Sequence, residues 1–212
     1  MPLSLTLIII ILTAITSFIA FSNQTVMEDL IFYPPAVTNR NQWYRFITCG
    51  FIHADIAHLA FNMLSLYFFG PALEKFFELY FEGAAKTLFL VFYASSLFVC
   101  LLPTYFKNKN NARYSSLGAS GAVSAVIFAT IFYSPLSKVG ILFLPEMPGF
   151  IFGPVYLIIT AVMAKRGRDN INHSAHLWGG IYGIVFFTVA CFAFSDFNPL
   201  TNFVDQVKSY FH

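Results

Sequence analysis

Apolar runs alternate with short polar segments along the chain. The runs predict helices over residues 3–21, 57–80, 84–102, 118–133, 149–164 and 173–194. About twenty apolar residues cross the hydrocarbon core of a bilayer as a helix. We therefore expect an all-α integral membrane protein with six transmembrane helices, in which residues 1–212 form a single polytopic domain. The first run has no basic segment before it and exceeds a signal-peptide core, so we expect it to be an uncleaved helix.

The connection over residues 22–56 is too polar to span a membrane and too aromatic for a free linker. It contains Pro34, Pro35, Trp43 and Tyr44. We expect this first loop to lie in the plane of the membrane interface. The tail over residues 195–212 is polar with spaced apolar residues, which predicts a segment on the surface.

Composition strengthens the membrane assignment and excludes other classes. The chain is 58% hydrophobic and 10% charged, with a mean hydropathy of +0.68, whereas soluble domains carry about 25% charged residues. The net charge of +2 is too small to indicate nucleic acid as a partner. The lipid bilayer is the partner that the composition implies. The three cysteines are far apart and have neither metal-ligand nor disulfide-framework spacing. The pattern predicts no oligomeric state.

Basic residues are concentrated in the connections after the first, third and fifth helices, which share one side of the membrane. These are Arg40, Arg45, Lys107, Lys109, Arg113, Lys165, Arg166 and Arg168, against Lys75, Lys86, Lys138 and Lys208 on the other side. The positive-inside rule would place the first group in the cytoplasm.

Strongly polar side chains in apolar helices are costly and are functional candidates by default. Four of them stand near the starts of the second, fourth and sixth helices: His58, Asn62, Ser120 and His176. These three helices run in the same direction, so their starts lie on one face of the membrane. The pattern therefore predicts that the four residues share one depth.

Ser120 lies between Gly118 and Gly121 at the start of an apolar run. A helix start carries unpaired N–H groups and the positive end of the macrodipole, which would stabilise a negative oxygen there. The two glycines would let another helix or a substrate backbone approach. The alternative is a small-residue packing face between helices.

His176 is followed one helical turn later by Gly179, which would let its helix approach the glycines around Ser120. A serine activated by histidine needs a hydrogen bond of about 2.6–3.2 Å. The alternative is a histidine that donates to a backbone carbonyl. Asp169 is seven residues earlier, in a loop, so the pattern favours a Ser–His dyad over a triad.

His58 and Asn62 are four residues apart and share one helical face. With the N–H of Ser120 they could supply three donors to an oxyanion. The alternative is a polar pair that joins helices. A serine, a histidine and two further donors together are typical of an acyl-transfer site.

At this point the sequence resembles the rhomboid intramembrane serine proteases. The resemblance covers about residues 44–183 and rests on five elements in order. They are Tyr44–Thr48 followed by His53, His58-x-x-x-Asn62, Gly70-x-x-x-Glu74, Gly118-x-Ser120-Gly121, and Ala175-His176-x-x-Gly179.

The resemblance implies Ser120 as nucleophile, His176 as general base and then acid, and His58 with Asn62 as oxyanion donors. It implies structural roles for Arg45 and Glu74, and it implies neither a metal nor a cofactor. Substrates would be single-pass transmembrane proteins that enter laterally, with residues 149–164 as gate and the loop over residues 165–169 as cap. We expect the chain to lie in the cell (inner) membrane. In the family the active-site mouth is usually on the extracytoplasmic side, whereas the basic residues favour the opposite side, so orientation stays open.

Two positions depart from the family pattern. Ser124 stands where the family often has a Tyr or Phe that packs on the catalytic histidine, so Trp178 or a phenylalanine would have to hold His176. Glu78 stands where a glycine is common after the motif glutamate.

Three alternatives stay open. The first is an inactive relative that binds membrane clients without cutting them. The second is a metal-dependent membrane enzyme or carrier, in which the histidines and one carboxylate would be ligands: His53, His58, His173, His176 and Asp169. The third is a small channel or a purely structural protein.

Overall fold

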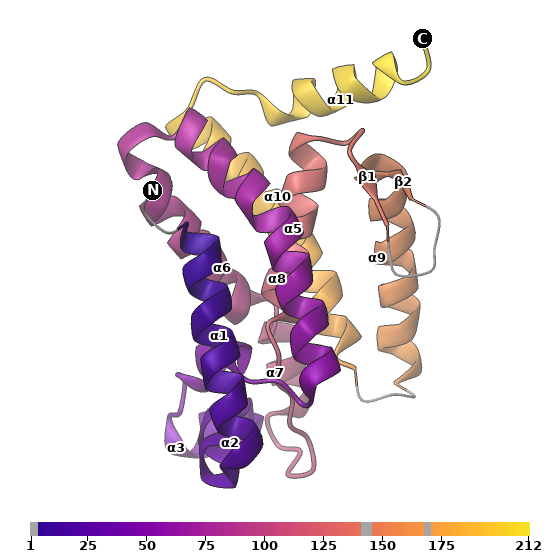
Figure 1. The fold of residues 1–212 in the computed structure, drawn as a ribbon. Coiled ribbons are helices and arrows are strands. Elements are labelled where there is room, and N and C mark those ends of the chain that lie inside the picture. Colours follow the sequence, from indigo (N-terminus) through magenta and orange to yellow (C-terminus); the bar gives the residue numbers. More distant parts are fainter. Residues whose placement is uncertain (1–3, 141–145, 168–170) are drawn as a thin grey trace.

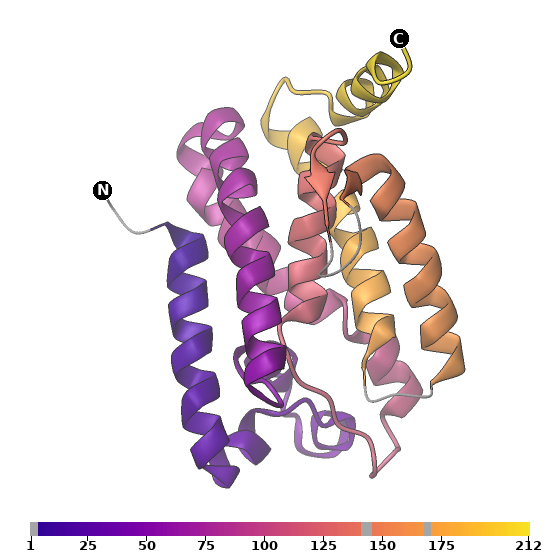
Figure 2. The same cartoon turned by 45° about the vertical axis from the view of Figure 1, so that its right-hand side comes forward.

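The structure is a computed structural model that describes residues 4–140, 146–167 and 171–212. It is a bundle of helices, shown in Figures 1 and 2. The long apolar helices are α1 (Leu5–Ser22), α5 (Ile56–Tyr80), α6 (Ala85–Val99), α8 (Ser120–Tyr133), α9 (Gly149–Arg166) and α10 (His173–Phe194). The expected all-α membrane fold is confirmed.

Within the described residues, five segments are long and apolar enough to cross a membrane: α1, α5, residues 82–108, α9 and α10. The remaining apolar helix, α8, has only 14 residues, which corresponds to about 21 Å of helix. It packs against α5, α6, α9, α10 and α11 and is buried along most of its length. This helix begins in the middle of the bundle and ends next to α11 (Figure 2).

The first loop contains more helix than its composition suggested. It forms α2 (Gln24–Leu30), α3 (Pro34–Arg40), α4 (Arg45–Thr48) and the 3-10 turn η1 (Cys49–Phe51), gathered at one end of the bundle. The buried Arg45 fixes them, because its Nη1 donates to the carbonyls of Glu28 and Ile31 at 2.7 and 2.8 Å. Its Nε donates to Gln42 at 2.6 Å.

The third apolar run ends earlier than predicted and is followed by another helix. After α6 ends at Val99, α7 covers Leu102–Asn108, part of which was predicted as a basic loop. Pro103 is in the first turn of α7, where a missing N–H costs nothing. Pro103, the first residue after the predicted helix over residues 84–102, therefore lies at the beginning of the next helix.

Two short strands and a helix lie at the other end of the bundle. Strands β1 (Lys138–Val139) and β2 (Met147–Pro148) pair antiparallel, and the tail forms α11 (Pro199–Ser209). Figure 1 shows α11 lying across the ends of the membrane helices. Asn202 and Gln206 both donate to the carbonyl of Tyr133, the last residue of α8, at 2.8 and 3.1 Å.

Glu74 connects α5 to the start of α1. Its carboxylate accepts hydrogen bonds from the backbone N–H groups of Leu5 and Thr6 at 2.6 and 3.0 Å. It also accepts one from the Thr6 hydroxyl at 2.8 Å. A carboxylate at a helix N-terminus satisfies unpaired N–H groups and complements the macrodipole.

Candidate active site

The segment before α8 runs as irregular chain from the end of α7 into the middle of the bundle, where α8 begins (Figure 2). Irregular backbone at membrane depth is tolerated only where the protein satisfies its polar groups. Here Ser116 and Phe32 exchange two backbone hydrogen bonds of 3.0 Å, and Gly118 donates to the carbonyl of Cys49 at 2.9 Å. The first loop thus fixes the segment that carries Ser120.

Gly118 is required by both its conformation and its surroundings. Its φ is +110°, which residues with a side chain rarely adopt. A Cβ there would also lie 2.8 Å from Cε1 and 2.9 Å from Nε2 of His58. The imidazole of His58 therefore lies directly against the backbone two residues before Ser120.

His53 is fully buried and contacts Ala119, the residue after Gly118. The Ser17 hydroxyl donates to the Phe51 carbonyl at 3.0 Å and lies 3.0 Å from His53 Nδ1, so Nδ1 carries the proton. Nε2 then accepts from the N–H of Ala119 at 3.4 Å. Burial, and secondarily the nearby His58, lower the pKa of His53 to about 3, while Asp55 opposes the shift. His53 is thus a neutral imidazole.

The helices α8 and α10 pack against each other through small residues. A Cβ at Gly179 would collide with the carbonyl of Gly121, and one at Gly183 would collide with the carbonyl of Ala125. Gly179 and Gly183 are four residues apart, as in the small-x-x-x-small pattern that lets membrane helices approach closely. The close approach expected from Gly179 is therefore present.

This approach brings Ser120 and His176 together. Nε2 of His176 lies 2.7 Å from Oγ of Ser120, at the first turns of α10 and α8. Both residues are half-buried. The distance is within the range that a nucleophile and its base require.

Asn62 lies one turn after His58 on α5, as its spacing predicts, and is 2% exposed. Its Nδ2 donates to the backbone carbonyl of His58 at 2.9 Å, within its own helix. An amide nitrogen has a second hydrogen. A direct bond from Asn62 to a substrate oxygen would use that second hydrogen and stays a prediction.

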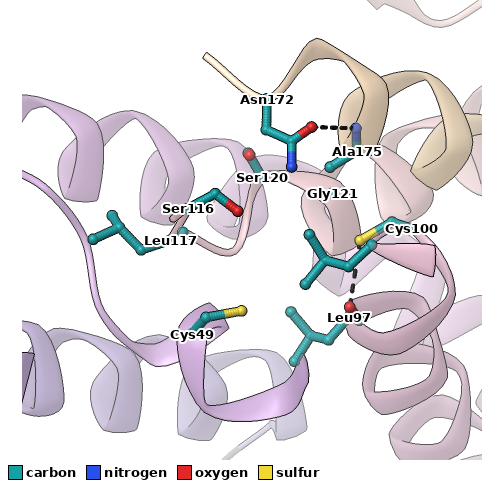
Figure 3. A pocket seen from close by; sticks show the side chains of 11 residues that line it. Cys49, Leu97, Cys100, Ser116, Leu117, Ser120, Gly121, Asn172 and Ala175 are labelled. Atoms are coloured by element: carbon teal, nitrogen blue, oxygen red, sulfur yellow. Dashed lines mark hydrogen bonds between the residues drawn. The ribbon is translucent and has the colours of Figure 1, made fainter. Parts of the chain in front are cut away.

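A small pocket of about 20 Å³ lies behind Ser120, between η1, α6 and the start of α10 (Figure 3). Cys49, Leu97 and Cys100 form its apolar side, and Ser120 and Asn172 contribute polar groups. Oδ1 of Asn172 caps α10 through Ala175 at 3.1 Å and accepts from Thr104 at 3.1 Å. Among the described residues, Nδ2 of Asn172 has no hydrogen-bond partner. Such a pocket has room for about one water.

Ser124 is approached by a tyrosine from another helix. The hydroxyl of Tyr156 on α9 lies 3.4 Å from the Ser124 hydroxyl, and its ring packs near Phe128 and Phe152. Trp178, one of the residues expected to hold His176, is 43% exposed, and that role stays a prediction. The ring of His173 lies edge-on to His176, with centroids 5.9 Å apart. The periodicity of single helices could not predict Tyr156, because this contact joins two helices.

The metal alternative depended on Asp169, which lies outside the described residues together with the end of the expected cap loop. Within residues 4–140, 146–167 and 171–212, no group of three His, Cys, Asp or Glu side chains is arranged to hold a metal ion. His53 uses both ring nitrogens in the contacts described above.

Comparison with known protein families gives a match over most of the chain. The family model of the rhomboid domain matches residues 40–192 of the chain, which include Ser120 and His176. The chain belongs to the rhomboid family. It is accordingly an integral membrane protein with several membrane helices.

Similar rhomboid proteins come from distant organisms. The chain is 32% identical over 142 residues to RHOMBOID-like protein 12, mitochondrial, of Arabidopsis thaliana, covering 63% of this chain and 42% of that protein. It is 32% identical over 140 residues to the putative rhomboid protease YdcA of Bacillus subtilis, covering 65% of this chain and 62% of that protein. It is 30% identical over 142 residues to the human presenilin-associated rhomboid-like protein, mitochondrial, covering 65% of this chain and 35% of that protein. The match thus spans less than two thirds of these relatives.

Proposed function

We propose that the chain is an intramembrane serine endopeptidase in which Ser120 and His176 form a catalytic dyad. The hydrogen bond of 2.7 Å between Ser120 Oγ and His176 Nε2 carries this proposal. Membership of a family that includes proteins named as rhomboid proteases supports it.

The dyad would work by acyl transfer. Ser120 Oγ attacks the scissile carbonyl while His176 Nε2 takes its proton, which requires the tautomer protonated at Nδ1. His176 then gives that proton to the departing amine, leaving an ester on Ser120. A water that loses a proton to His176 attacks this ester, releases the acid product and restores Ser120.

The developing oxyanion would lie at the N-terminus of α8. The N–H of Ser120 is in the first turn of that helix, where N–H groups lack intrahelical partners and the macrodipole is positive. The His58 imidazole lies against Gly118, two residues before Ser120, and would be a side-chain donor to the oxyanion. Asn62 would contribute through its second amide hydrogen, after a small rotation.

The pocket behind Ser120 would supply water to the second half of the reaction. Its volume of about 20 Å³ suits a single molecule. Nδ2 of Asn172, which has no hydrogen-bond partner in the part of the chain that the structure describes, can donate to that water. A stored water matters here because the surrounding helices face hydrocarbon.

The proposed substrates are single-pass transmembrane proteins, cut in or near the membrane segment. Ser120 lies at the start of a helix inside the bundle, so a substrate would have to reach it from within the membrane. The scissile bond must be extended, since a helical carbonyl is already hydrogen-bonded and shielded. Segments with helix-breaking or small residues near the cut would therefore be preferred.

A proteolysis assay in proteoliposomes tests the proposal. Fluorescent single-pass substrates are reconstituted with wild type, Ser120→Ala or His176→Ala, and the products are mapped by mass spectrometry. We expect cleavage by wild type only, with all three proteins equally stable. Ser134→Ala, which alters a serine just after the far end of α8, should cut like wild type. Cleavage by folded Ser120→Ala would refute the dyad. Cleavage that a chelator abolishes would point to the metal alternative.

A further inference from the structure

A second cavity, of about 160 Å³, lies between α8, α9, α10 and α11. Its lining is made of apolar side chains and glycines, among them Phe128, Ile131, Gly153, Leu157, Ile184 and Phe203. It borders the second half of α8, whereas Ser120 is at the start of that helix. It is therefore separate from the candidate active site.

Water is a poor occupant of this cavity. A buried water needs two to four polar partners, and apolar cavities of this size stay dry and take apolar guests. The lining contributes almost no polar surface. Three of the four helices around the cavity are membrane helices, so the solvent nearest to it is hydrocarbon.

The cavity is open to the side and closed at the end. Pro154 lines it and is also exposed on α9. Ile158 and Ile159 on the same helix are 65% and 55% exposed, which marks a lipid-facing surface. At the end of the bundle, Phe203 of α11 lines the cavity and stacks on Phe132 with centroids 5.0 Å apart. Figure 1 shows α11 lying across this end of the bundle. Entry is therefore from the bilayer.

We propose that this cavity binds one acyl chain of a membrane lipid. Lateral access, an apolar lining and a closed aqueous end are together the properties that such a chain requires. The bound chain packs against Gly153 and Pro154, in the part of α9 that precedes Tyr156. The site does not depend on the proposed proteolysis, and either can fail without the other.

Photo-crosslinking in nanodiscs tests the site. The protein is reconstituted in phosphatidylcholine that carries a diazirine within one acyl chain, irradiated, and digested for mass spectrometry. We expect adducts at cavity residues from three helices, namely Ile131, Leu157 and Ile184. Adducts at the exposed Ile158 and Ile159 report the surrounding bilayer and are the internal reference.

Gly153 provides a matched pair of variants. A Cβ there would lie 3.5 Å from Phe128, an ordinary contact, so Gly153→Ala leaves the cavity open. Gly153→Leu places a branched side chain in it. We expect adducts at Ile131 and Ile184 to fall at least about tenfold in Gly153→Leu, and to persist in Gly153→Ala, with the reference adducts unchanged.

If Gly153→Leu fails to fold, Ile184→Trp fills the cavity from α10 and should have the same effect. Thermal unfolding identifies which variants are folded. Two results would overturn the proposal: no cavity adducts in wild type beside normal reference adducts, or undiminished cavity adducts in a folded, filled variant.

Discussion

At the scale of residues, glycines set the distance between Ser120 and His176. Neither residue would reach the other if α8 and α10 were separated by the usual 8–10 Å between helix axes with larger side chains. The carbonyl of Gly121 occupies the space where a side chain of Gly179 would be. The motif glycines are therefore part of the chemistry, although they make no hydrogen bond to a substrate.

Gly179→Ala should lower proteolysis by about 100-fold, because a displacement of about 1 Å can cost that much. The added methyl meets backbone, which cannot rotate away. Gly180→Ala is the control, since its methyl would meet the Phe128 ring at 3.0 Å, and a ring can shift. Activities are measured in proteoliposomes. Equal activity of Gly179→Ala and Gly180→Ala would show that this contact does not set the distance.

His53 should make stability depend on pH. In the folded state its pKa is about 3, whereas an unfolded histidine has 6.5. The unfolded chain therefore binds the extra proton between these values. The contribution of neutral His53 to the free energy of unfolding is therefore complete above pH 6.5. It is lost as the pH falls toward 3, by at most about 1.4 kcal/mol per pH unit.

The variant His53→Gln, which does not titrate, isolates that contribution. It should be less stable than wild type at pH 7.5, because it loses the contacts to Ser17 and Ala119. Its unfolding temperature should change less between pH 7.5 and 5 than that of wild type. Parallel pH profiles for the two proteins would exclude His53 as the titrating group.

At the scale of elements, the hydroxyl groups of Ser124 and Tyr156 join α8 and α9 near the site. Ser124 is one turn after Ser120, and Tyr156 reaches it from α9, the helix that the family resemblance implies as the substrate gate. If α9 must move to admit substrate, this bond holds the gate closed. A polar bond between membrane helices contributes about 0.6 kcal/mol.

Tyr156→Phe removes only the hydroxyl and should raise kcat/KM for a transmembrane substrate about threefold. Ser124→Ala removes the same bond from the other side and should have the same effect. The double variant should show no further gain, which a double-mutant cycle measures. Additive gains would mean that the two hydroxyls act independently.

At the scale of the whole molecule, single buried ionic groups connect distant segments. Arg45 gathers the helices of the first loop under the site, and Glu74 attaches α1 to α5 at the other end. Glu78, one turn later, is exposed. Substitutions of the buried Glu74 and the exposed Glu78 can therefore be compared for their effects on the free energy of unfolding.

Glu74→Gln should lower the free energy of unfolding by about 2 kcal/mol, since it weakens three hydrogen bonds to a charged group. Glu78→Gln should change it by less than about 0.5 kcal/mol. Thermal unfolding in detergent measures both. Equal effects would remove Glu74 as the connection between α1 and α5.

The sequence predicted the helices and the motifs within them, but it did not predict the contacts between separate segments. Uncharged runs located the long helices, and the order of the motifs indicated the family. The start of α8 was predicted two residues early because Gly118 and Ala119 are apolar and small, yet their N–H groups bond to Cys49 and His53 instead of continuing a helix. Asn172 before an apolar run was a readable N-cap, but its pocket and the Tyr156 contact exist only once helices pack.

The most direct test of the central claim is covalent labelling by a fluorophosphonate probe. The purified protein is labelled in detergent and the modified residue is identified by mass spectrometry, for wild type, Ser120→Ala and His176→Ala. We expect one adduct, on Ser120, which is absent in both variants while their unfolding temperatures match wild type. An adduct on Ser120 that forms equally fast in His176→Ala, or labelling that persists in Ser120→Ala, would contradict it.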